Sequence, residues 1–172
     1  MLKLLGALLI LFAGTMLGFQ QAARFAARPR QLRQTAHALQ RLETEIGYGH
    51  TPLPEALSRT AAFVPNPLNR MLMLASEGLA SDEGLSFRES WERAVREIWG
   101  ATAMRASEQA VLIRLGSTLG ISDREDQLKH LKLALIQLKA EEDSAREDQA
   151  RYETMWKSLG VLIAVLLVIL MV

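Results

Sequence analysis

Three histidines and one run of acidic residues are the side chains of this sequence best suited to chemistry. His37, His50 and His130 lie far apart, none has a partner at metal-ligand spacing, and no HExxH pattern is present. The acidic run Glu141-Glu142-Asp143 has the carboxylates that acid–base catalysis uses, but it is interpreted more simply as a solvated helix face. We therefore expect no catalytic residue, no metal ligand, no cofactor site and no small-molecule substrate, and a protein that is not an enzyme.

Composition narrows the function further. The chain has no cysteine, which excludes disulfides, thiol nucleophiles and cysteine-ligated zinc. It lacks the GxxxxGK[ST] loop of ATP-binding proteins and the GxSxG elbow of hydrolases. The apolar blocks of residues 4–19 and 159–172 carry no charge, and Lys3 is the only charged residue outside the stretch between them, so that stretch has 19 basic and 19 acidic residues and no net charge. A balanced charge argues against nucleic acid as a partner, because phosphate binding favours a basic excess.

Two apolar segments at the ends of the chain are predicted to cross a membrane. The first, residues 1–22, contains sixteen residues from Leu4 to Phe19 without a charge, and the second, residues 156–172, has none after Lys157. A cleavable signal peptide is the alternative for the first segment, and a buried core helix for the second. Arginines closely follow the first segment, which places that flank in the cytoplasm. Both predicted spans then tether one cytoplasmic domain to the membrane lipid.

Small residues recur at four-residue spacing in both apolar segments. Gly14 and Gly18 form a GxxxG pair in the first, and Gly160 and Ala164 form a similar pair in the second. Such spacing lets helices approach closely in lipid, so these faces are candidates for packing between the two spans. Chance is a nearly equal explanation, because small residues are common in membrane helices.

The intervening domain, residues 27–150, is predicted to be an all-α bundle of about six helices, because it is rich in good helix formers. Pro29 is expected to interrupt helical structure, with the first bundle helix starting at Gln31. Later helix starts are predicted from two patterns. A capping residue precedes proline at Thr51-Pro52 and Asn66-Pro67, and serine stands three residues before glutamate at Ser86–Glu89 and Ser122–Glu125. The fifth helix is expected over residues 102–115.

The last helix is predicted to be long and continuous with the C-terminal span. Four leucines repeat at 3-4-3 spacing along its first part, namely Leu128, Leu131, Leu135 and Leu138. No proline or glycine interrupts the chain between Ile121 and Leu159. The stretch Glu141–Glu153 is polar almost all round, so it is expected to be a solvated stalk.

Three segments carry a resemblance to a known family: "LETEIGYGHTPLPEALSR", "EGLSFRESWERAV" and "LGSTLGISDREDQLKHL". Together with the two apolar ends, they resemble the stage III sporulation protein AB family over essentially the whole chain. More distantly, the domain is similar to the helical repeat of the inner-membrane platform proteins of type II secretion and type IV pili. Their proline-containing helix start and "EAL" element are matched by Gly49, Pro52, Leu53, Glu55, Ala56 and Leu57. Their Gly-Glu-x-x-Gly turn is matched by Gly116–Gly120, with Ser117 in place of the glutamate, so the role of that acid does not carry over.

The resemblance implies a component of a secretion-like channel complex between mother cell and forespore, located in the mother-cell membrane. The partners it implies are a secretion-type ATPase encoded alongside and other stage III sporulation proteins. A platform or adaptor would bind them through exposed connectors, and the candidate contact residues are Ser81, Asp82, Glu83, Ser117, Thr118 and Asp123. The alternatives are that these loops are plain connectors in a passive membrane-anchored spacer, or that the protein is an enzyme acting at the membrane surface.

Overall fold

The computed structural model describes the backbone of residues 26–49, 51–81, 84–120 and 123–171, and the side chains of these residues up to 155 except 153 and 154. Within these ranges every regular element is a helix and no strand occurs. The first helix covers residues 26–47, and five more follow in chain order: α2 (Leu53–Ala61), α3 (Leu68–Ala80), α4 (Phe87–Trp99), α5 (Ala106–Thr118) and α6 (Arg124–Met171). The predicted all-α bundle of about six helices is therefore confirmed.

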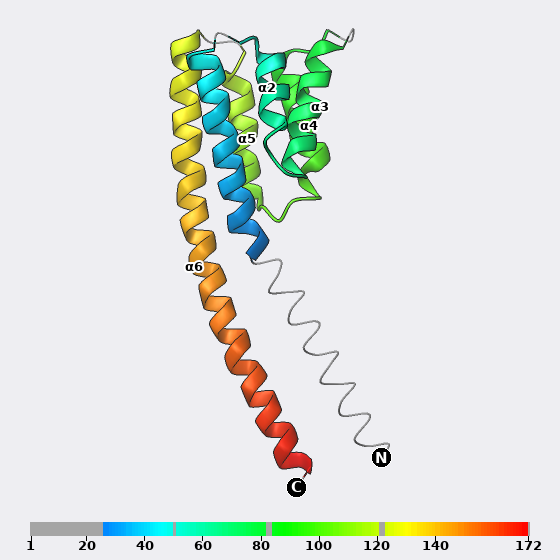
Figure 1. Ribbon diagram of the computed structural model, residues 1–172, viewed down its shortest axis with the longest axis vertical. Coiled ribbons are helices and arrows are strands. Elements are labelled where there is room, and N and C mark those ends of the chain that lie inside the picture. Colours follow the sequence, from blue (N-terminus) through cyan, green and yellow to red (C-terminus); the bar gives the residue numbers. More distant parts are fainter. Residues whose placement is uncertain (1–25, 50, 82–83, 121–122, 172) are drawn as a thin grey trace.

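Sequential helices pack against one another from α2 to α6, and the first helix lies beside α6 (Figure 1). The apolar faces meet in one core, to which the first helix contributes Leu32, Leu39, Leu42 and Ile46. Trp91 of α4 lies at its centre without solvent exposure and donates its indole N–H to the carbonyl of Leu112, at 2.7 Å. A buried indole needs such an acceptor, because an unpaired donor in the core is costly.

The predicted 3-4-3 seam is confirmed as the buried face of α6. Leu131 and Leu138 are fully buried, while Leu128 and Leu135 pack against the core from its edge. The helix then continues without a break to Met171, as its lack of proline and its single late glycine predicted. Among the residues searched, those that the structure describes, no helix is both long and apolar enough to cross a membrane. Residues 1–22 lie outside that part of the chain, as do the side chains of residues 156–172.

Several predicted helix starts are wrong. Residues 26–30 are helical, so Pro29 does not interrupt the first helix; its ring is buried, and Arg28 beside it is held by ion pairs. Thr51 does not cap α2, because its hydroxyl instead donates to the Glu45 carboxylate at 3.1 Å. No side chain caps α3, so Asn66 does not have the predicted role.

The fifth and sixth helices also begin later than predicted. The structure places α5 at Ala106–Thr118 instead of residues 102–115, because the backbone N–H of Arg105 donates to the Glu108 carboxylate and fixes the first turn there. At α6, Asp123 rather than Ser122 lies at the cap, where its carboxylate accepts from the N–H of Asp126 at 2.9 Å. By contrast, the capping box of Ser86 and Glu89 at α4 is confirmed.

Candidate docking surface and buried charge clusters

Three connectors meet at one end of the bundle, which we call the distal end: residues 47–52, 81–86 and 119–123. In Figure 1 this end lies at the top, opposite both residue 26 and the continuation of α6. Gly120, at φ +90°, passes so close to the start of α4 that a Cβ on it would lie 2.7 Å from the Cβ of Phe87. The connector before α6 therefore presses on the residue that follows Ser86, and two regions chosen separately from the sequence form one surface.

The third connector is tied to this surface by Arg124, the first residue of α6. Its Nε donates to the carbonyl of Ile46 at 2.9 Å, and its Nη2 donates to the carbonyl of Gly47. These carbonyls belong to the last turn of the first helix, where no N–H group of the helix can donate to them, so the guanidinium caps the helix. Nothing in the local sequence indicated this contact, since the residues are more than seventy positions apart.

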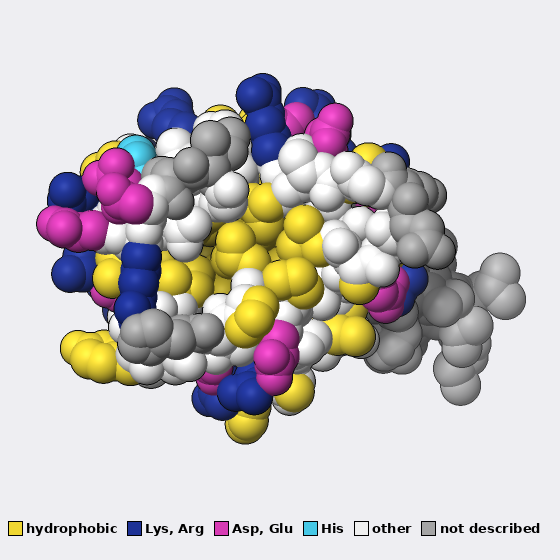
Figure 2. Space-filling model, turned by 90° about the horizontal axis from the view of Figure 1, so that it is seen from above, with side chains coloured by type: hydrophobic (Ala, Val, Ile, Leu, Met, Phe, Trp, Pro, Cys, Tyr) yellow, Lys and Arg dark blue, Asp and Glu magenta, His cyan; other side chains and the backbone are white. Residues whose placement is uncertain are grey.

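The distal end has an apolar centre. Figure 2 looks directly onto it and shows hydrophobic side chains at the bottom of a hollow, with basic and acidic side chains around the edge. An apolar centre with a polar rim is the usual anatomy of a protein–protein interface.

The structure brings only part of the predicted contact set to this surface. Ser81 ends α3, and its hydroxyl donates to the carbonyl of Gly78 at 2.8 Å, while Asp123 is occupied as the cap of α6. Asp82 and Glu83 lie outside the described residues. The placement of Ser117 and Thr118 in a loop is wrong, because both belong to the last turn of α5.

The hydroxyl groups of Ser117 and Thr118 donate to backbone carbonyls one turn earlier in α5, at 2.7 and 2.9 Å. Of the residues considered for packing between spans, Gly14 and Gly18 lie outside the described chain. Gly160 and Ala164 lie on α6, beyond its described side chains.

A buried charge cluster, which sequence reasoning missed, lies at the opposite or proximal end of the bundle. Arg28 of the first helix donates from Nε to the Glu108 carboxylate of α5 at 2.9 Å, and its Nη2 contacts the same carboxylate. It also pairs with Glu141 at 2.9 Å and with Asp148 at 3.4 Å, both on α6. Arg105 reaches Asp148 at 3.0 Å. One buried guanidinium thus joins three helices, and Glu108, with no solvent exposure, depends on it for charge compensation.

A second cluster surrounds Glu142, which is only 3% exposed. Arg33 of the first helix donates to it at 3.0 Å, and Lys139 and Arg146 approach from one turn before and after on α6. Burial alone would raise the pKa of Glu142, but these hydrogen bonds outweigh it and hold the pKa below its ordinary value. The predictions of a solvated acidic face and a solvated stalk are therefore wrong at Glu142 and at the equally buried Ala145.

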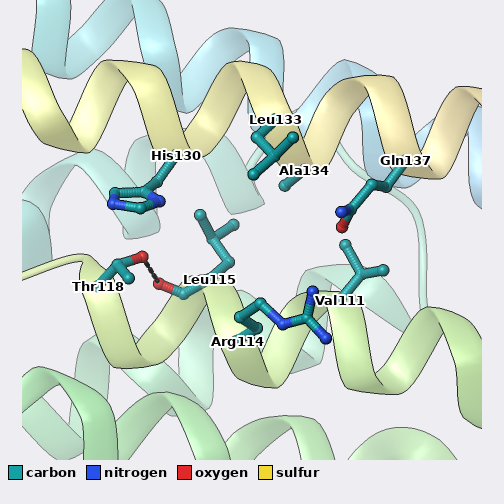
Figure 3. Close-up of a pocket in the computed structure, with 8 residues that line it drawn as sticks. All are labelled: Val111, Arg114, Leu115, Thr118, His130, Leu133, Ala134 and Gln137. Atoms are coloured by element: carbon teal, nitrogen blue, oxygen red, sulfur yellow. Dashed lines mark hydrogen bonds between the residues drawn. The ribbon is translucent and has the colours of Figure 1, made fainter.

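The histidines do not converge on one another. His130 lines a small hollow between α5 and α6 together with Arg114, Thr118, Leu133 and Gln137, and no carboxylate lines it (Figure 3). His37 is exposed on the first helix, and His50 lies outside the described residues. Over the described part of the chain, no group of three or more histidine, aspartate or glutamate side chains could hold a metal ion.

The comparisons with known proteins agree with one another. The family model of stage III sporulation protein AB matches residues 3–172. A curated relative, stage III sporulation protein AB of Bacillus subtilis strain 168, is 45% identical over 172 residues, which is 99% of each chain. The chain belongs to the stage III sporulation protein AB family. A solved structure of a stage III sporulation protein AB superposes with a TM-score of 0.68 at 41% identity, covering 73% of this chain and 98% of that one.

Membership of the stage III sporulation protein AB family confirms the resemblance drawn from the three sequence segments and supports a role in sporulation.

Proposed function

We propose that this protein is a non-enzymatic platform of a secretion-like channel complex between mother cell and forespore. In this proposal residues 1–22 and 156–172 anchor it in the mother-cell membrane, and the bundle of residues 27–150 lies in the cytoplasm. The distal end binds the secretion-type ATPase and other stage III sporulation proteins. The observation that carries the proposal is that three connectors form one surface at the end of the bundle opposite both residue 26 and the C-terminal part of α6.

The length of α6 sets how far this surface would stand from the membrane. From Arg124 to the start of the predicted span at residue 156 there are 32 residues, which at 1.5 Å per residue span about 48 Å. A surface held at this height is accessible to a large cytoplasmic partner. The surface also has the apolar centre and charged rim that suit a protein partner (Figure 2).

The buried charge cluster supports a platform rather than a loosely tethered domain. Arg28 follows the first apolar segment, and it is bound to Glu141 and Asp148 on the helix that leads to the second. The two chain segments that lead to the proposed anchors are thereby held together at the proximal end of the bundle. A partner that pushes on the distal end would then move the bundle and both anchors as one body.

The test is binding of the full-length protein, held in lipid nanodiscs, to the purified ATPase. Glu125 at the start of α6 is exposed, and Glu125→Lys reverses a charge at the distal rim; Arg88→Glu does the same in the first turn of α4, where Arg88 is exposed. Glu97→Lys is the matched control, because Glu97 is exposed at the proximal end of α4. We expect each rim variant to weaken binding by about tenfold and the control to change it by less than about twofold.

Three results would contradict the proposal. Absence of ATPase binding by the wild-type protein would refute the platform role. Equal binding by all variants would show that the ATPase does not contact the distal end. Release of the full-length chain from membranes by alkaline washing would show that residues 1–22 and 156–172 do not anchor it in the membrane. If the wild-type protein binds the ATPase but the rim variants do not impair assembly of the complex in sporulating cells, the protein acts as a passive spacer.

A further inference from the structure

A basic stripe runs along the outer face of the first helix, away from the distal end. It consists of Arg30, Gln34, His37 and Arg41, whose spacing of four, three and four residues places them on one face. Arg30 and His37 are exposed, and Gln34 and Arg41 are half-buried. Over eleven residues the stripe extends about 16 Å, or three helical turns. Neither the distal surface nor the buried clusters use these side chains.

The upper half of the stripe borders the larger of the two surface hollows that stand out on the described chain. Gln34, His37, Ala38 and Arg41 form one wall, and the connector between α2 and α3 forms the other with Phe63, Val64 and Pro65. Its volume of about 330 Å³ can accept a large side chain, whereas the hollow between α5 and α6 offers about 20 Å³. Four of its seven lining residues are apolar, so the inserted group would be apolar too.

The positive charge of this face is not compensated by the chain itself. Most arginines of the bundle pair with a carboxylate, as Arg28, Arg33 and Arg59 do. For Arg30 and Arg41, no carboxylate lies within 4 Å in the part of the chain that the structure describes. Two unpaired guanidinium groups on one helix face favour a partner that supplies negative charge.

Arg41 and Phe63 have the properties of a binding hot spot. The guanidinium carbon lies 3.6 Å from the centroid of the Phe63 ring, and Nε is buried without a hydrogen-bond partner. Phe63 is 67% exposed, so most of its side chain remains open to a partner. Arginine and aromatic residues are enriched among the residues that dominate binding energy. A partner carboxylate at Arg41 would complete the stacked pair.

We propose that this face binds an acidic amphipathic helix of another protein, lying along the first helix. One large apolar side chain of that helix enters the hollow beside Phe63, and carboxylates about three turns apart pair with Arg30 and Arg41. The stripe follows the helix axis, which runs from the proximal to the distal end (Figure 1). An elongated segment can therefore contact its whole length, whereas a flat bilayer surface across the proximal end can reach only its lower end. The site is independent of the distal surface.

The test places a photo-crosslinking amino acid at Phe63 of the full-length chain in sporulating cells and maps the crosslinked peptide by mass spectrometry. We expect a segment of another protein with net negative charge. Arg30→Glu and Arg41→Glu, introduced separately, should each lower its yield at least fivefold. Arg114→Glu is the matched control. This exposed arginine lies on α5, beside the hollow between α5 and α6, and it also has no carboxylate within 4 Å among the described residues. It should leave the yield unchanged.

Other outcomes overturn the proposal. Crosslinks to lipid would assign the stripe to the membrane surface, and crosslinks to a second copy of this chain would make it a self-association face. A protein crosslink that survives both charge reversals would show that the basic stripe does not select the partner. Far-UV circular dichroism of each variant excludes misfolding, which is not expected because neither Arg30 nor Arg41 forms an ion pair within the described part of the chain.

Discussion

Replacement of Arg28 by methionine tests whether the buried charge cluster holds the bundle together. Methionine keeps the length and apolar stem of the side chain but removes the guanidinium from a site where Arg28 is only 7% exposed. Glu108, which has no exposure, would keep only the backbone N–H of Arg105 as a described donor. Glu141 and Asp148 are about one third exposed and can turn to water, so the cost centres on Glu108.

An uncompensated buried charge of this kind costs about 3–5 kcal/mol. A domain of this size has a free energy of unfolding of roughly 5–15 kcal/mol, so the variant would lose a large share of its stability. At about 2–4 °C per kcal/mol, the melting temperature should fall by roughly 10 °C. Urea titration of the full-length protein in detergent, followed by circular dichroism at 222 nm and by tryptophan fluorescence, measures the free energy of unfolding. A thermal scan followed by circular dichroism at 222 nm measures the melting temperature.

Two further variants separate charge loss from lost packing. Arg33→Met is the same change on the same helix, but Arg33 is 54% exposed and its partner Glu142 keeps Lys139 and Arg146, so it should cost less than about 1 kcal/mol. Adding Glu108→Gln to Arg28→Met removes the orphaned charge and should recover most of the lost stability. The reasoning is refuted if Arg28→Met costs no more than Arg33→Met, or if the double variant is as unstable as the single one.

Three other predictions concern the core, the second charge cluster and a cap. Gly116→Ala should lower the free energy of unfolding by about 1–3 kcal/mol in urea titration, because the added Cβ would lie 2.2 Å from Trp91. The added Cβ of Gly100→Ala meets nothing within 4 Å, so this control variant should be neutral or stabilising. Because the pKa of Glu142 is lowered by folding, its contribution is present above the ordinary carboxylate pKa and is lost as pH falls through the lower folded value; Glu142→Gln should therefore flatten the acid limb of stability against pH. Ser86→Ala should cost about 1 kcal/mol, and an unchanged urea midpoint would contradict the capping box.

Local signals in the sequence predicted the elements well where the deciding contacts are also local. The capping box at Ser86 acts over three residues, and the leucine seam of α6 acts over successive turns. Several helix starts were predicted wrongly because another side chain forms the deciding contact, as Glu108 does at α5 and Asp123 at α6. At α2, Thr51 could cap the helix but instead binds Glu45 of the preceding helix.

The charge clusters could not have been predicted from local patterns. Arg28 is separated from Glu108 by 80 positions and from Glu141 by 113, and no periodicity links residues so far apart. The acidic stretch on α6 has polar residues on every side, which is typical of a solvated helix. Only the packing of the first helix against α6 converts one of those sides into an interface between helices.

On the proposed membrane topology, Arg28 and Arg33 would meet two demands at different stages. During insertion the chain would be unfolded, and positive charge after the first apolar segment would retain that flank in the cytoplasm, while acidic residues elsewhere would contribute little. After folding, Arg28 is neutralised by Glu108 and Arg33 by Glu142. Arg30, between them, faces outward and pairs with no described carboxylate. The same short basic run can thus orient the chain, close the bundle and leave one charge for recognition, because helical spacing separates its members onto different faces.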